Sequence, residues 1–109
     1  DVGADKDKVG TDGQTALILA SGQGHLEVVR FLCDVGADKD TAMPDGWTAL
    51  MLASNRGHLD VARLLLEAGA DKDKLGPNGA IASTLASQEG HLEVVHLLRT
   101  KQRRMVPRP

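Results

Sequence analysis

GHLEV, at residues 24–28, returns as GHLDV at 57–61 and again as GHLEV at 90–94, so one string recurs every 33 residues. Two flanking strings keep this register: GQTAL at 13–17 matches GWTAL at 46–50, and GADKD stands at 3–7, 36–40 and 69–73. A fixed period of this length indicates a stacked array, because a unit of this size buries its apolar face only by packing against its neighbours.

One period, DGWTALMLASNRGHLDVARLLLEAGAD at residues 45–71, resembles the ankyrin repeat, in which each unit is a turn followed by two antiparallel helices. The resemblance covers residues 1 to about 98 and implies an all-α helical solenoid with β-turn or short hairpin fingers. The expected divisions are the end of a preceding repeat at 1–8, repeats at 9–41, 42–74 and 75–98, and a basic tail at 99–109.

Each unit contains two helix signals that are separated by a glycine. Thr15 and Thr48 stand just before apolar runs, where a hydroxyl can accept hydrogen bonds from the first free amides of a helix. The glycines expected to end helices in the left-handed conformation are Gly24, Gly57 and Gly90 for the first helices, and Gly36 and Gly69 for the second ones. Turn-forming residues at 38–47 and 71–80 predict projecting fingers.

The composition is that of an ordinary globular protein, with 41% apolar and 26% charged residues. No apolar run approaches the roughly 20 residues that a membrane-spanning helix needs. Cys33 is the single cysteine, so the chain contains no internal disulfide and the sequence assigns no compartment. Because Cys33 stands where the next repeat has Leu66, we interpret it as a buried substitute for leucine rather than a reactive thiol.

The two ends of the chain carry different signals. Residues 1–5 align with 34–38, which is the exit from a second helix, so we expect further ankyrin repeats upstream in the same protein. After Leu98 the string GAD does not return, so we expect the array to stop there. Ser83 replaces a core leucine. This favours the polar outer face that an array end needs, although Ser83 could equally be a local weakness.

Histidines and acidic triplets are the residues that most invite a chemical interpretation. His25, His58 and His91 recur with the period and should lie about 10 Å apart, the spacing of packed helices, which is too far to share a metal ion. We expect them to bond backbone at the inter-helix turns. The Asp-Lys-Asp triplets lack the oxygen ligands and spacing of a calcium loop, so solvated turns are the favoured interpretation.

The sequence contains no nucleophile with a plausible base, no phosphate-binding glycine loop and no cysteine pair. We therefore expect no enzyme, no cofactor and no metal site. What remains is the surface that the resemblance implies for ligands, namely the finger tips and the inner face and ends of the first helices. The candidate partner-binding residues are Thr11, Asp12, Gln14, Gln23, Pro44, Asp45, Trp47, Asn55, Arg56, Pro77, Asn78, Gln88 and Glu89.

Trp47 stands out in this set, because tryptophan anchors many interfaces. Two interpretations stay open: Trp47 anchors a partner, or it merely lies over the small Ala80 of the next finger.

Charge is unevenly distributed along the chain. Residues 1–98 carry a net charge of -7, whereas residues 99–109 carry +5. A body of that charge is a poor ligand for nucleic acid, and the tail has no aromatic residue to stack on bases. The tail could touch phosphate, anionic lipid or an acidic protein patch through its basic residues, which include Lys101, Arg103, Arg104 and Arg108.

The sequence therefore predicts a non-catalytic protein-protein interaction module that binds a partner through its finger tips and concave first-helix face. An accessory structural subunit permanently packed into a larger multiprotein assembly is the first alternative. Binding of an anion or lipid by the tail is the second. No small-molecule substrate is expected, and the partner is another protein or a multiprotein complex.

Overall fold

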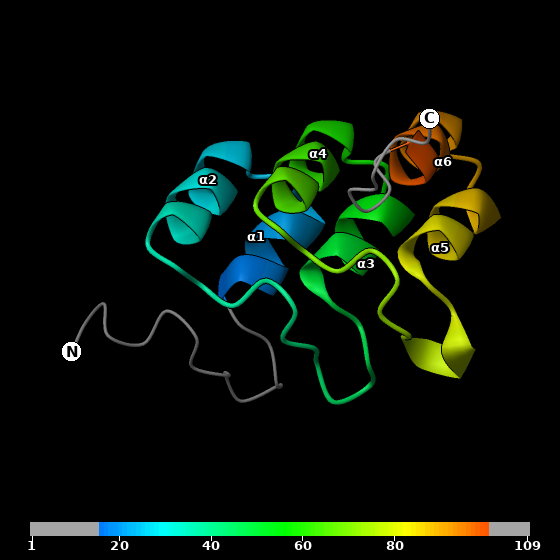
Figure 1. Cartoon of the computed structure of the whole chain (residues 1–109), viewed down its shortest axis with the longest axis horizontal. Coiled ribbons are helices and arrows are strands. Elements are labelled where there is room, and N and C mark those ends of the chain that lie inside the picture. The colour runs from blue at the N-terminus through cyan, green and yellow to red at the C-terminus, as the bar shows by residue number, and fades with distance from the viewer. Residues whose placement is uncertain (1–15, 101–109) are drawn as a thin grey trace, which may run out of the picture.

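The computed structural model describes residues 16–100, which form six α-helices in three consecutive antiparallel pairs (Figure 1). The pairs are α1 (Ala16–Gln23) with α2 (Leu26–Asp34), α3 (Ala49–Asn55) with α4 (Leu59–Glu67), and α5 (Ala82–Gln88) with α6 (Leu92–Thr100). A short 3-10 turn, η2 (Pro77–Gly79), lies at the tip of the segment between α4 and α5.

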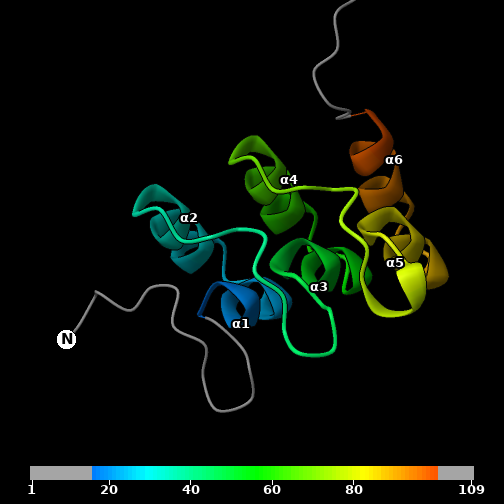
Figure 2. The same ribbon diagram turned by 60° about the horizontal axis from the view of Figure 1, so that its bottom comes forward.

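The helices form two layers. The first helices α1, α3 and α5 lie side by side in one layer, and the second helices α2, α4 and α6 lie side by side in the other (Figures 1 and 2). Among residues 16–100, the main packing of each helix is against its own partner and against the corresponding helices of adjacent repeats. This confirms the predicted all-α solenoid.

Each helix pair turns at a glycine whose backbone is left-handed. At the end of α3, Gly57 has a φ of 77°, its N–H bonds to Ser54 O at 3.2 Å, and His58 N–H bonds to Ala53 O at 2.9 Å. These two hydrogen bonds satisfy carbonyls that the last helical turn leaves without partners. The other predicted glycines also have positive φ values and end their helices in the same way: Gly24, Gly36, Gly69 and Gly90.

The start of α3 is capped as expected. Thr48 has an extended backbone, and its buried hydroxyl accepts a hydrogen bond from Met51 N–H at 3.2 Å. Thr15, the other predicted cap, lies outside the described residues. The last helix, α6, includes Arg99 and Thr100, so the helical part of the chain reaches two residues beyond the expected boundary at 98.

The core is aliphatic and extends through all three repeats. Leu17, Leu50, Leu65 and Leu98 are among the side chains that are almost completely buried. Cys33 is half-buried and packs against this core, and burial raises the pKa of its thiol above the ordinary value. A raised pKa lowers the thiolate fraction at neutral pH, which fits a packing role.

Two buried hydroxyls in the first helices lack partners. Ser21 and Ser54 occupy equivalent positions in α1 and α3, are completely buried, and their Oγ atoms make no hydrogen bond. A buried hydroxyl without a partner costs free energy. Because both side chains are small, they leave room for neighbouring helices to pack closely at these positions.

The glycine turn yields a first stability prediction. A Cβ at Gly57 would lie 2.7 Å from the His91 ring atoms Cε1 and Nδ1, and the left-handed backbone adds strain. We expect Gly57→Val to lower the free energy of unfolding by about 2 kcal/mol. Gly22→Ala is the control, because its Cβ would meet Leu52 and Arg56 at an ordinary 3.4 Å within a helix. It should be neutral or slightly stabilising in urea denaturation; equal losses from both changes would refute this account of the turn.

The serine and threonine hydroxyls yield a second prediction. Thr48→Ala removes a cap and should lower the free energy of unfolding by about 1 kcal/mol. Ser54→Ala removes a buried hydroxyl that has no partner, so it should be neutral or stabilising. Denaturant titration of both variants tests the difference, and a larger loss for Ser54→Ala would show that its hydroxyl has a partner in solution.

Candidate functional site

The segments between repeats form fingers that project beyond the first helices (Figure 1). In the finger of residues 38–47, Met43 N–H bonds to Trp47 O at 2.9 Å and Gly46 N–H bonds to Met43 O at 2.7 Å. In the finger of residues 71–80, Gly76 N–H bonds to Ala80 O at 2.7 Å. The predicted hairpin fingers are therefore present in both places.

Adjacent fingers are joined at the base and near the tip. Asp71 N–H donates to Asp40 Oδ1 at 2.8 Å, which links the two bases. Near the tip, Gly46 lies so close to the next finger that a Cβ on it would be 3.4 Å from Pro77 N. The two fingers therefore lie against each other and are held together by contacts within the chain.

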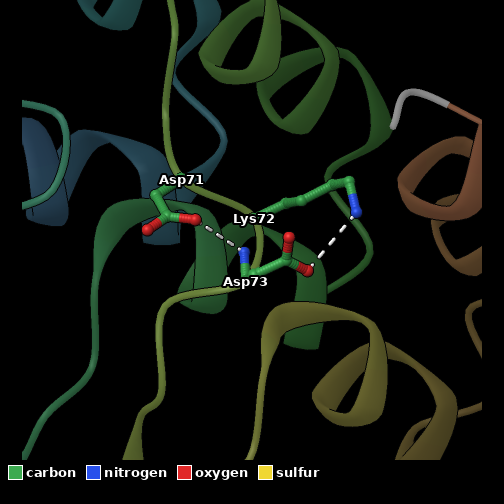
Figure 3. Close-up of polar contacts among 3 residues, drawn as sticks. All are labelled: Asp71, Lys72 and Asp73. Atoms are coloured by element: carbon green, nitrogen blue, oxygen red, sulfur yellow. Dashed lines mark hydrogen bonds and ion pairs between the residues drawn. The ribbon is translucent and has the colours of Figure 1, made fainter. Parts of the chain in front are cut away.

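The Asp-Lys-Asp triplet of the second finger forms a local turn (Figure 3). Asp71 Oδ1 accepts a hydrogen bond from Asp73 N–H at 2.9 Å, and Lys72 Nζ lies 3.4 Å from Asp73 Oδ1. Asp40 N–H makes the same contact with Asp38 Oδ1 at 2.9 Å. Among residues 16–100, no group of three or more His, Cys, Asp or Glu side chains is placed to hold a metal ion. The triplets thus shape and connect the fingers.

The finger candidates differ in exposure. Pro44 and Asp45 are exposed, and Asp45 Oδ1 accepts a hydrogen bond from Trp47 N–H at 3.3 Å. Asn78 is exposed in a left-handed conformation, with a φ of 58°, and Pro77 beside it is half-buried. Trp47 is half-buried and packs against the hydrophobic core. Trp47 therefore contributes to core packing and keeps part of its surface exposed to solvent.

One exposed apolar residue of the fingers, Leu75, is not among the residues predicted from the sequence. The side chain of Leu75 is 68% exposed. Leu75 belongs to the finger of residues 71–80, which lies against Gly46 in the finger of residues 38–47. A signal was present in the sequence, because Leu75 is a large apolar residue in a segment otherwise made of polar and turn-forming residues, at the position where the preceding finger has the small Ala42. An exposed leucine on a fixed turn is a candidate contact residue.

The candidates at the ends of the first helices have additional roles. Asn55 Nδ2 donates to Leu85 O at 3.3 Å, and Arg56 Nη1 donates to Gly22 O at 3.0 Å, so both side chains bridge to an adjacent repeat. Gln23 is exposed and its Oε1 accepts a hydrogen bond from His25. The remaining two, Gln88 and Glu89, are exposed.

The structure does not bring all candidates into one cluster. The fingers precede the first helices and the helix-end residues follow them, so the two groups are separated by the length of a first helix. For the seven residues of α3 this is about 10 Å. Most of α3 between them is buried, with Leu52 half-buried. The candidate residues therefore fall into two groups: a finger patch, consisting of Pro44, Asp45, Trp47, Leu75 and Asn78, and a separate row of helix ends.

One of the three periodic histidines, His58, makes a hydrogen bond to the preceding repeat. His58 Nε2 lies 3.1 Å from Gly22 O, and because a carbonyl only accepts, the ring donates this hydrogen bond. Gly22 O thus receives donors from both Arg56 and His58. The expected bonding of these histidines to backbone is present at His58, where it joins two repeats instead of closing the local turn.

Some candidates fall where the structure gives no description. Thr11, Asp12 and Gln14 of the first predicted finger, and Lys101, Arg103, Arg104 and Arg108 of the tail, lie outside the described residues. None of the helices between residues 16 and 100 is both long and apolar enough to cross a membrane.

Comparison with known proteins agrees with this architecture. A family model described as ankyrin repeats in three copies matches residues 2–76 and 44–106. No curated protein is significantly similar to the chain.

Proposed function

Because this chain belongs to the ankyrin-repeat family, whose members are generally protein-protein interaction modules, we propose that it is a non-catalytic module that binds another protein through its finger patch. The observation that carries this proposal is the 68% exposure of Leu75 on a finger that is fixed to its neighbour. When a partner covers a leucine that is exposed to water on a turn, the burial of its apolar surface lowers the free energy of the complex.

The rigidity of the fingers supports binding. The hydrogen bond from Asp71 N–H to Asp40 Oδ1 and the close approach of Gly46 to Pro77 hold both fingers in place. A partner therefore does not have to order these turns, so less conformational entropy is lost on association. Trp47 adds a partly exposed aromatic ring, and tryptophan is enriched among residues that dominate interface energies.

The net charge of the fingers indicates which chemical groups a complementary partner surface carries. Residues 38–47 and 71–80 together carry five Asp and three Lys, a net charge of -2. Two of these lysines are engaged, since Lys39 Nζ donates to Ala37 O and Lys72 Nζ contacts Asp73. A complementary partner surface has an apolar centre that meets Leu75 and Trp47, with basic groups around it.

The row of helix ends extends the contact area. Two fingers cover only part of a standard interface of about 800 Å² per partner, so further area has to come from Gln23, Arg56, Gln88 and Glu89 or from repeats ahead of residue 16. Arg56 retains donors for a partner, because only Nη1 is used by Gly22 O.

A permanent place in a larger multiprotein assembly is the alternative form of the same activity, and it uses the same surface.

The experiment begins with affinity purification using residues 1–109 and identification of the captured protein, followed by titration of that purified protein. Leu75→Ser should weaken binding about tenfold or more, corresponding to about 1.4 kcal/mol. Leu92→Ser is the matched control, since Leu92 is a similarly exposed leucine, at 71%, in a cleft between α4 and α6 away from the fingers. It should leave the affinity unchanged.

Two further variants distinguish the alternatives. Trp47→Ala should weaken binding by about 2 kcal/mol, and its circular dichroism and thermal midpoint are recorded because the ring also packs against the core. Deletion of residues 101–109 should leave binding intact. If binding survives Leu75→Ser and Trp47→Ala but is lost on deleting the tail, the tail is the recognition element. If Leu92→Ser is the damaging change, the cleft between α4 and α6 is the site.

A further inference from the structure

The layer of second helices carries a shallow cleft that belongs neither to the core nor to the finger patch. It lies between α4 and α6, which are neighbours in this layer (Figure 2), and has a volume of about 450 Å³. Leu59 and Arg63 of α4 line one side, and Leu92, Glu93, His96 and Thr100 of α6 line the other. We call it the α4–α6 cleft.

Leu92 is the large apolar side chain that this cleft leaves in water. Its side chain is 71% exposed, whereas Leu26 and Leu59, at the equivalent positions of the first two helix pairs, are half-buried and pack against the core. Among residues 16–100 no helix follows α6, so no helix covers Leu92. A segment that covered it would remove apolar surface from water and lower the free energy.

The cleft also carries negative charge that the described part of the chain does not neutralise. In α4, Asp60 lies 3.5 Å from Arg63 and forms an ion pair with it. The equivalent residues of α6 are Glu93 and His96, and no ion pair joins the exposed Glu93 to another residue among 16–100. Glu67, also exposed, is one period before the last residue of α6, which places a second carboxylate near the end of that helix.

The segment that follows α6 has the complementary chemistry. Residues 101–109, KQRRMVPRP, contain four basic residues, no acidic one, and the adjacent apolar residues Met105 and Val106.

The length of this segment matches the cleft. From Thr100 back to Leu92 the nine-residue helix α6 measures about 12 Å along its axis. Five extended residues reach up to about 17 Å, so a chain that reverses after Thr100 can place Met105 beside Leu92 and Arg104 beside Glu93. Because Thr100 itself lines the cleft, the effective concentration of the tethered segment there is on the order of millimolar, and a weak contact is sufficient.

We propose that residues 101–109 fold back along the α4–α6 cleft of their own chain, antiparallel to α6, so that Met105 covers Leu92 and Arg104 pairs with Glu93. Docking of this kind withdraws the basic side chains of the segment from phosphate or anionic lipid, so the cleft controls whether the tail is available to an external anion. The finger patch lies on other elements and stays open. The proposal therefore holds whether or not the fingers bind the proposed partner.

The test is NMR of residues 1–109 with ¹³C-labelled methionine and leucine methyl groups. The Met105 methyl should show nuclear Overhauser effects to the Leu92 methyls and a chemical shift that differs from its value in the urea-denatured chain. Leu92→Ser should remove the contact and return the Met105 shift to that value, while unchanged Met43 and Met51 methyls confirm the fold. Leu75→Ser is the matched control, since Leu75 is a similarly exposed leucine, at 68%, on a finger, and it should leave Met105 unchanged.

A change in the tail gives the reciprocal measurement without altering the helices. In Met105→Gln, the Leu92 methyls should take the shifts that they have when residues 101–109 are deleted. Leu92 shifts that are the same in the unchanged chain, in Met105→Gln and in the deletion would overturn the proposal.

Charge variants separate docking in the cleft from general attraction to an acidic body. Glu93→Arg should lower the ratio of docked to free tail several-fold. Glu27→Arg is its control, because Glu27 occupies the same position in α2, two repeats earlier, and should have no effect. Equal losses from both variants, or a Met105 methyl that keeps its denatured-state shift in the folded chain, would refute the proposal. So would a Met105–Leu92 contact that disappears on dilution, because a second copy would then supply the tail.

Discussion

The stacking of the helix pairs depends on one steric constraint: in the first two pairs, the glycine that joins the two helices has no room for a side chain. At Gly57 the backbone is left-handed, and the His91 ring of the next repeat occupies the space where a Cβ would project. Local turn geometry and packing between repeats therefore impose the same requirement on one position. The helix pair and the stack are consequently not independent, because the residue that permits the turn also permits the neighbour to approach.

Much of this architecture could be predicted from the sequence because it follows from local backbone preferences repeated at a fixed interval. The cap at Thr48, the glycine turns and the fingers all have signals within a few residues. The hydrogen bonds of Asn55 and Arg56 were harder to predict from the sequence. Their acceptors, Leu85 O and Gly22 O, are about one period away in the sequence and come within reach only when the repeats stack. Exposure at Leu75 likewise depends on how the finger is oriented, which the sequence pattern does not specify.

Neighbouring fingers and neighbouring helix pairs are joined by the same kind of hydrogen bond, between a side chain and the backbone. Polar side chains join neighbours through backbone groups: Asp40 accepts from Asp71 N–H, and His58 donates to Gly22 O. Backbone acceptors and donors are present whatever the side chain, so such contacts leave nearby surface positions free to vary. A repeat family whose members bind partners of no common type gains from this arrangement, because the scaffold contacts and the recognition contacts use different atoms.

Gly22 O receives hydrogen bonds from Arg56 and His58, and both donors come from the next repeat. The last turn of α1 is therefore completed by its neighbour. Under tension applied to the two ends of the chain, we expect each such boundary to resist separately, since the main packing among residues 16–100 joins adjacent helix pairs. The array should then lengthen in discrete steps, one boundary at a time, because its stability is a sum of contributions from neighbouring repeats.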